Sequence, residues 1–307
     1  MAGNFWASSH HEQWMFDKAE LQRFRFEDFK VFPEEEYDKF MIFWCNLIQA
    51  IALEGIPSQP KARMQVVATA MVYFKRFYIR HTFKDVDPFL MACASIFLAS
   101  KVEEHGQMSM SKMMNCIPAL LKRFPNINFD ASSKIAGLYD AEFILVETMD
   151  CCLIVYHPYR PLLTFMADIA KDNKEDITDL EAESWKVVND SLRTDAVFLF
   201  PPHLIAVASI ILGSQFLEKE YYIKNWLPEI NIDQQCLMEC IELICNMYLA
   251  YNSINEKDDY KTMIEKLPRI QTAPPNMGPG QGGIHCKTQM DPKMRYAAAG
   301  DRGRVCI

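Results

Sequence analysis

The chain has 307 residues, half of them hydrophobic, which is enough to bury the cores of two domains of ordinary size. Its formal net charge of −8 at pH 7 argues against direct nucleic-acid binding, because such binding needs a strong positive field. Its ten cysteines include no C-x2-C pair and no glycine-rich phosphate loop is present, so neither a metal nor a cofactor is predicted.

Apolar residues recur three and four positions apart almost throughout the chain, which predicts an all-α protein. In the N-terminal segment, residues 1–32, the letters "SHHE" from Ser9 fit a capping box for a first short helix. Pro33 and the three glutamates after it are typical of a helix start, and Gly55 ends that helix. Further helices are predicted over residues 61–80, from Pro88 with Asp87 as its cap, and over 109–121 and 130–149.

A second set of helices with similar relative lengths follows the first. These helices are predicted over residues 161–170, 178–197, 202–217, around 221–226, and 233–251. The first set defines a predicted domain of residues 33–152, and the second set one of residues 153–255. The longest uncharged run, Ala196–Leu217, is not a membrane span, because two prolines leave about fifteen apolar residues where roughly twenty are needed.

The two sets are related by an internal repeat. "PFLMACASIFLASK" from Pro88 and "PHLIAVASIILGSQ" from Pro202 align without a gap at an offset of 114 (202 − 88), with eight of fourteen positions identical. Val66 and Val67 align with Val187 and Val188 at an offset of 121 (187 − 66). Two copies are too few for a solenoid, so we expect paired five-helix domains, each with its third helix as the buried axis.

Residues 256–307 form a predicted tail. From Pro268 the sequence "PRIQTAPPNMGPGQGG" is too poor in apolar residues to pack, so this segment is expected to be disordered.

A lysine interrupts the apolar pattern at the end of the first copy of the repeat. Met91, Ala94 and Leu98 form one stripe of a helix, and the next place on that stripe is Lys101. The second copy has Gln215 at this place. One interpretation is a cation that suits the negative end of its own helix and reaches water there.

A glutamate interrupts a second apolar row. Ile135, Leu138, Leu145 and Met149 share one face of the helix predicted over 130–149, and Glu142 lies at the centre of that face. A carboxylate there must be paired, hydrogen-bonded or at an opening in the packing. Either Lys101 and Glu142 form an internal ion pair, or both point outward and await the backbone groups of a partner.

The sequence resembles the cyclins. The resemblance rests on "FLASKVEE", on the glutamate in "AEFILVETMD" about forty residues later, and on the doubled five-helix pattern. "MAGNFWASSH", "VYFKRFY" and "DCCLIVYHPYRPL" are similar to the branch of the family that belongs to the kinase module of Mediator. The resemblance covers roughly residues 1–265 and leaves the tail out.

This resemblance implies two tandem cyclin boxes and a regulatory protein that is not an enzyme. Its implied partner is the cyclin-dependent kinase of the Mediator kinase module, and its implied role is regulation of RNA polymerase II transcription in the nucleus. Lys101 and Glu142 match the cyclin residues that hydrogen-bond the backbone at the end of the kinase's regulatory helix. Phe74, Phe77 and Phe143 are expected to add apolar contact area around them.

Other Mediator subunits are a second implied partner. Trp185 and Asn189 lie four apart on one predicted helix face with Asp190 beside them, and Trp6 is a candidate neighbour. Without the resemblance, such an aromatic-amide pair is more often an ordinary domain contact. The chain departs from cell-cycle cyclins in one place, because "MIFWCNLIQA" replaces their Met-Arg-Ala-Ile-Leu docking patch.

A rival from another class is a cyclin-fold transcription factor or scaffold that binds other transcription proteins without activating a kinase. A DNA-binding version should show a basic face and often an N-terminal zinc ribbon, whereas this chain is acidic and begins with a predicted capped helix.

Overall fold

The computed structural model describes residues 3–54, 61–106, 108–122, 137–173, 176–255 and 258–267, and all regular structure within them is helical. The predicted all-α class is therefore confirmed. The described residues divide into two compact units, the first made of residues 19–154 and 253–267, and the second of residues 3–18 and 155–252. The predicted disordered segment from Pro268 lies outside the described residues.

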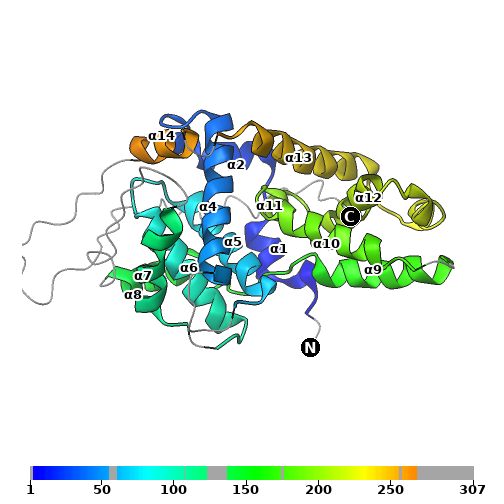
Figure 1. Ribbon diagram of the computed structural model, residues 1–307, viewed down its shortest axis with the longest axis horizontal. Coiled ribbons are helices and arrows are strands. Elements are labelled where there is room, and N and C mark those ends of the chain that lie inside the picture. Colours follow the sequence, from blue (N-terminus) through cyan, green and yellow to red (C-terminus); the bar gives the residue numbers. More distant parts are fainter. Residues whose placement is uncertain are drawn as a thin grey trace, which may run out of the picture. The chain divides into compact units, whose positions relative to one another are not determined.

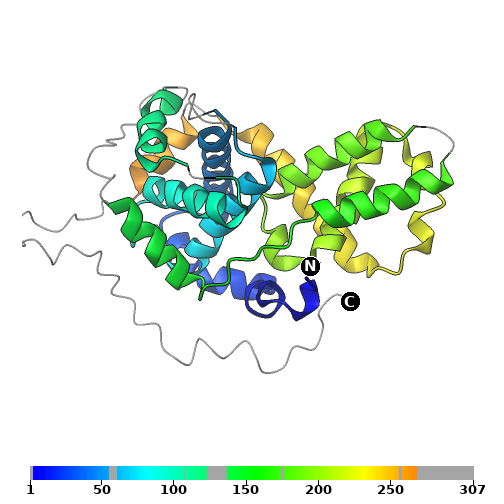
Figure 2. The ribbon, with the colours of Figure 1, turned by 90° about the horizontal axis from the view of Figure 1, so that it is seen from below.

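The first unit is built around helix α6. Its helices are α2 (Lys18–Phe24), α3 (Phe26–Phe29), α4 (Glu34–Glu54), α5 (Met64–Arg80), α6 (Pro88–Val102), α7 (Met110–Leu121), α8 (Leu138–Thr148) and α14 (Asp259–Lys266). α6 packs against α4, α5, α7 and α8 (Figure 1). Figure 2 shows the same unit from below, with the green helix α8 at its outer edge.

A capping side chain at the start of α6 and a left-handed turn at its end define where this helix begins and ends. Asp87 accepts hydrogen bonds from the backbone N–H groups of Phe89 (2.9 Å) and Leu90 (3.2 Å), so its carboxylate caps the helix as predicted. Every residue from Pro88 to Ser100 is buried, which makes α6 the axis of the unit. The helix ends in a Schellman turn, where the His105 N–H bonds the Ser100 carbonyl at 3.0 Å and Glu104 has a φ of +50°.

The second unit repeats this arrangement around helix α12. Its elements are η1 (Phe5–Ala7), α1 (Ser9–Trp14), α9 (Tyr159–Asp172), α10 (Thr178–Ser191), α11 (Ala196–Leu199), α12 (Pro202–Phe216), η3 (Glu220–Tyr222), η4 (Leu227–Glu229) and α13 (Gln234–Ser253). α12 ends in the same turn, with the Lys219 N–H bonding the Ser214 carbonyl at 2.8 Å and Glu218 at a φ of +56°. Glu104 and Glu218 are 114 positions apart (218 − 104), so the repeat extends to the backbone of the helix end.

Two details of the predicted helices are corrected by the structure. The cap of α1 is Ser8 and not Ser9, since its hydroxyl accepts the His11 N–H at 3.3 Å. The segment predicted as one helix over 178–197 breaks between α10 and α11. There Thr194 accepts the Ala196 N–H at 3.1 Å and donates to the Ser191 carbonyl at 2.7 Å, and these bonds compete with the helical ladder.

The N-terminal segment and the predicted tail also contain more structure than the sequence indicates. Helices α2 and α3 follow α1 within residues 1–32. Residues 259–266, which we assigned to the tail, form α14, because Tyr260 and Met263 are buried against the first unit. Short segments of this kind owe their helical structure to tertiary packing, which a periodicity pattern does not reveal.

Gly213 provides a test of the packing in the second unit. A Cβ atom at this position would lie 2.8 Å from Ser184 Oγ and 3.0 Å from its backbone nitrogen, so Gly213→Ala must push α10 away from α12. We expect the free energy of unfolding to fall by about 1–3 kcal/mol, measured by urea denaturation. Gly137→Ala is the control, because its Cβ would make only an ordinary contact at 3.5 Å with Leu90; equal stability of the two variants would contradict the packing described.

Candidate functional site

Lys101 and Glu142 meet at the surface of the first unit. Lys101 Nζ, at the end of α6, lies 2.6 Å from Glu142 Oε1 on α8. The side chain of Lys101 is 42% exposed and that of Glu142 is 14% exposed. The apolar neighbours of Glu142 in its row, Leu138, Leu145 and Met149, are fully buried, so the pair marks the point where the core reaches solvent.

The pair keeps hydrogen-bonding capacity for further groups. An ammonium has three donors and a carboxylate has two acceptor oxygens, and within the described part of the chain one donor of Lys101 and one oxygen of Glu142 are engaged. A half-exposed ion pair contributes only about 0–1 kcal/mol to stability. Stability therefore gives a weak reason for placing two charges in apolar rows, and binding gives a stronger one.

Aromatic side chains surround the ion pair. Lys101 Nζ lies 4.0 Å from the centroid of the Phe97 ring, which favours the cation there. Phe143 is 72% exposed, and Tyr139, one turn earlier on α8, is 66% exposed. Tyr139 is not among the site residues predicted from the sequence, although its position four residues before Phe143 and three before Glu142 places all three on one side of the helix.

The structure corrects the expected role of Phe74 and Phe77. Both side chains are fully buried and offer no surface to a partner in this arrangement. Phe74 packs on Tyr78 at 4.9 Å, and Phe77 stacks on His81 at 4.6 Å between ring centroids. They therefore hold α5 in the core, and of the three predicted phenylalanines only Phe143 is exposed.

The end of α6 that carries Lys101 is held by the start of α5. Glu103 accepts hydrogen bonds from Thr69 Oγ1 and from Gln65 Nε2, both at 2.6 Å. Arg63 donates to the backbone carbonyls of Glu103 (3.1 Å) and Glu104 (3.2 Å). A guanidinium at the negative end of α6 offsets the two glutamates there, which fixes the backbone next to Lys101.

The end of α8 is held by buried side chains of α5. Arg76 donates to the Cys152 carbonyl at 2.8 Å, and the Tyr73 hydroxyl donates to the Leu153 carbonyl. Burial lowers the pKa of Arg76 to about 10, which still leaves the guanidinium charged at neutral pH. These bonds to carbonyls just after α8 limit how far the helix that carries Glu142 can move.

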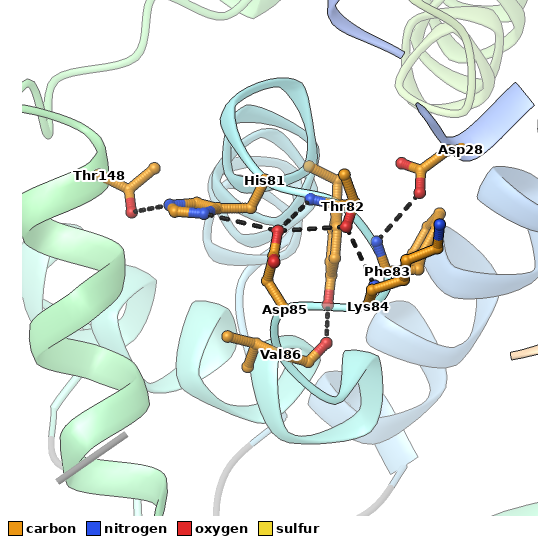
Figure 3. A network of polar contacts seen from close by, with 9 residues as sticks. Asp28, His81, Thr82, Phe83, Lys84, Asp85, Val86 and Thr148 are labelled. Carbon is orange, nitrogen blue, oxygen red and sulfur yellow. Dashed lines mark hydrogen bonds and ion pairs between the residues drawn. The ribbon is translucent and has the colours of Figure 1, made fainter. Parts of the chain in front are cut away.

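The turn between α5 and α6 ties together three parts of the first unit (Figure 3). Within the turn, Asp85 accepts the Thr82 N–H at 2.7 Å. His81 Nε2 lies 3.0 Å from Thr148 Oγ1 on α8, and the Phe83 N–H donates to Asp28 Oδ1 on α3 at 3.1 Å (Figure 3). The turn thus connects the helices that carry the ion pair to the N-terminal helices.

Two groups of this network have perturbed pKa values. Burial raises the pKa of Asp28 to about 6. The hydrogen bond from the Phe83 N–H lowers this pKa, but it offsets only part of the effect of burial. Burial also lowers the pKa of His81. Asp28 is 2% exposed, so its carboxylate is costly at neutral pH.

Trp185, Asn189 and Asp190 lie together on α10 of the second unit. The Trp185 ring stacks on Tyr159 at 4.9 Å, and the Tyr159 hydroxyl donates to Asn189 Oδ1 at 2.8 Å. Asp190 accepts from Arg193 (3.1 Å) and from the Tyr248 hydroxyl (3.0 Å). Among the described residues, the indole N–H of Trp185 and the amide NH2 of Asn189 have no acceptor, so three N–H donors remain for another molecule.

Trp6 lies in an aromatic cluster of the same unit. The centroid of its ring lies 5.2 Å from that of Phe5, 5.0 Å from that of His11 and 5.8 Å from that of His203. Its side chain is 40% exposed. Phe5 in turn contacts Tyr156 at 5.7 Å, three residues before the tyrosine that stacks on Trp185. The segment that leads into α9 therefore touches both predicted parts of this surface.

The described residues contain no group of three metal-binding side chains, and no helix among them is long and apolar enough to cross a membrane.

Two sequence families match the chain. The family described as "Cyclin, N-terminal domain" matches residues 53–153, and "Cyclin C-terminal domain" matches residues 157–252. Cyclin-C of Caenorhabditis elegans is 42% identical over 289 residues, which cover 90% of this chain and 96% of the relative. Cyclin-C of Drosophila melanogaster is 41% identical over 276 residues, covering 89% and 99%.

Solved structures show the same fold. A chain in the cryo-EM structure of the yeast TFIIK (Kin28/Ccl1/Tfb3) complex has a TM-score of 0.60 and 25% identity, covering 78% of this chain and 100% of that chain. A chain of the CAK complex from Chaetomium thermophilum has a TM-score of 0.63 at 20% identity, covering 86% and 87%.

Asp28→Asn tests the buried carboxyl. Because the pKa of Asp28 is raised from 3.8 to about 6, the folded state binds more protons than the unfolded state between these values, and stability falls as pH rises through them. The asparagine keeps an acceptor for Phe83 without the charge. We expect it to increase the free energy of unfolding by about 1–3 kcal/mol at pH 7.5 and to change it little at pH 4.

The measurement is urea denaturation at both pH values. Asp140→Asn on the exposed face of α8 serves as the control, and it should change stability by less than about 1 kcal/mol at both, because within the described part of the chain Asp140 interacts only with the helix dipole in the first turn of α8. A lower stability of the Asp28→Asn protein at pH 7.5 would show that its negative charge is compensated in the folded chain.

Proposed function

This chain belongs to the cyclin family, and we propose that it binds and activates the cyclin-dependent kinase of the Mediator kinase module and thereby regulates RNA polymerase II transcription in the nucleus. As a member of this family it is a regulatory subunit and not an enzyme. The observation that carries the proposal is the surface ion pair of Lys101 and Glu142.

The ion pair has the chemistry to hold the end of a partner's helix. The free donors of Lys101 match carbonyl groups that a helix leaves unpaired at its C-terminus, and the free oxygen of Glu142 matches a backbone N–H. In the second unit the equivalent position, Gln215, is also exposed but uncharged. Of these two equivalent positions, only that of the first unit therefore carries a cation.

The exposed aromatic residues supply the energy that the polar pair cannot supply alone. Moving a kinase from about 1:99 active to 99:1 requires a preference of roughly 5.5 kcal/mol for the active state. Removing one side of a desolvated charge pair typically costs about 2–5 kcal/mol, so apolar burial has to contribute as well. Phe143 and Tyr139 flank the pair and would lose their exposed area in a complex.

Phosphoryl transfer itself belongs to the kinase. That reaction depends on the position of nucleotide, metal ions and substrate hydroxyl, and a cyclin contributes by fixing the kinase helix that aligns them. The rigid support behind Lys101 and Glu142, from Glu103 and Arg76, suits this role because a loose surface could not impose one kinase conformation.

The cluster around Trp185 on α10 supports the second part of the proposal, contact with other Mediator subunits. A half-buried aromatic stack with unused donors beside it is typical of the centre of a protein interface. Trp6, Asn189 and Asp190 extend the surface with one exposed ring and two polar groups.

An exchange of the two charges separates binding from stability. In the double variant Lys101→Glu/Glu142→Lys the intramolecular ion pair can form again, but each helix presents the wrong charge to the kinase. We expect kinase affinity to fall at least about 30-fold, roughly 2 kcal/mol, with kinase activation lost and the unfolding temperature unchanged. Affinity is measured by calorimetry and activation by phosphate transfer to a peptide.

The control is one ion pair of the second unit, Lys219 with Asp179 at 2.5 Å, in which the lysine has a similar exposure (35%) and the carboxylate is more exposed (38%) than Glu142. Lys219→Asp/Asp179→Lys should leave kinase affinity unchanged. If the first exchange leaves binding and activation intact, the kinase is held by a contact other than Lys101 and Glu142. If the unchanged chain neither binds nor activates the kinase, the rival scaffold function is favoured.

Trp185→Ala tests the Mediator surface. The change removes one ring of the stack together with its indole N–H donor. We therefore expect Mediator subunits other than the kinase to be recovered at least about tenfold less in co-purification. Kinase activation by the purified pair should stay within about twofold, because α10 belongs to the second unit. Leu249→Ala, at a 67% exposed position on α13, is the control; equal recovery with both variants would exclude this surface.

A further inference from the structure

Helix α14 packs on α4, although the two helices lie at opposite ends of the chain. Figure 1 shows α14, in orange, beside α4. Lys266 Nζ at the end of α14 lies 2.5 Å from Glu36 Oε2 in the first turn of α4. The chain thus returns to its first unit after completing the second, and places one short helix there.

One side of α14 makes this contact. Tyr260 is 1% exposed and Met263 is 3% exposed, and the Tyr260 ring lies 4.8 Å from that of Phe43 on α4. Tyr260, Met263 and Lys266 follow one another at intervals of three, so they share a helix face. Phe43 is fully buried with α14 in place.

α14 is too short to be helical without this contact. It has eight residues, whereas isolated helices shorter than about 12–15 residues are marginal in water. Asp259 in its first turn and Lys266 in its last suit the helix dipole but cannot replace packing. Its folding is therefore coupled to binding on α4, as for a peptide helix that enters an apolar groove.

We propose that the face of α4 formed by Glu36 and Phe43 is a docking site for a short amphipathic helix, and that α14 is its resident occupant. The site recognises an aromatic residue, an aliphatic residue three positions later and a lysine three positions after that. The tether gives α14 a high effective concentration, so a partner helix of this pattern competes with it for the site. This inference does not depend on the kinase partner proposed above.

A peptide of residues 255–267 with a fluorescent label tests the site. In the full chain, Tyr260→Ala/Met263→Ala weakens the resident helix, and we expect this variant to bind the peptide at least about tenfold more tightly than the unchanged chain, measured by fluorescence anisotropy. Equal binding to both proteins, or no binding to the variant, would overturn the proposal.

A charge exchange identifies the site on α4. Lys266→Glu in the peptide should weaken its binding to the opened variant severalfold, and Glu36→Lys in that variant should restore it. Both residues are 36% exposed, so these changes should not affect folding. Failure of the exchange to restore binding would place the peptide elsewhere and contradict the proposal.

A measurement on the unchanged chain guards against a variant that does not fold. Hydrogen exchange of the α14 amides should become faster when unlabelled peptide is present in excess at about millimolar concentration, because the peptide then matches the effective concentration of the tethered helix and displaces it. Exchange of the α12 amides should stay the same. If peptide in excess leaves the α14 amides unaffected, α14 is a fixed part of the fold and the docking proposal is wrong.

Discussion

The surface of the first unit depends on one constraint, which is that Lys101 stands at the end of its most buried helix and must reach solvent there. α6 is enclosed along its length, so a charged side chain is tolerated only where the helix reaches solvent. Glu142 has the same constraint on α8, and the two charges meet at 2.6 Å. The bonds made by Glu103, Arg76 and His81 then keep these two helix ends in place, which gives the surface pair a rigid base.

The two halves of the chain show how one scaffold serves two purposes. Both axial helices end in the same left-handed turn, at Glu104 and Glu218, and both are buried along most of their length. The differences lie on the surface, where the first unit presents an ion pair with exposed aromatic residues and the second an aromatic stack on α10 with free donors. Repetition has kept the core and left the exposed positions free to diverge.

Helix positions with strong local signals could be predicted from the sequence, and positions set by tertiary packing could not. Asp87 and Pro88 place the start of α6 because a cap and a first-turn proline act locally. In "VYFKRFY" every residue is buried, even Lys75 and Arg76, so no periodicity could show that Phe74 and Phe77 both face the core. The interruption of apolar rows by Lys101 and Glu142 was informative because charges seldom interrupt such rows without a reason.

The most direct test of the account compares two lysines in the unchanged protein. Lys101 is 42% exposed and Lys219 is 35% exposed, and each pairs with one carboxylate. The hydrogen bonds of Lys219 to Asp179 and to the Tyr222 hydroxyl raise the pKa of Lys219 and slow its acylation, so each lysine is compared with its own rate in the free chain. With the kinase bound at saturation, residue-resolved mass spectrometry should show acylation of Lys101 reduced at least about fivefold and that of Lys219 unchanged, because a contact with backbone carbonyls removes the ammonium from solvent. Equal acylation of Lys101 with and without a bound kinase would contradict the account.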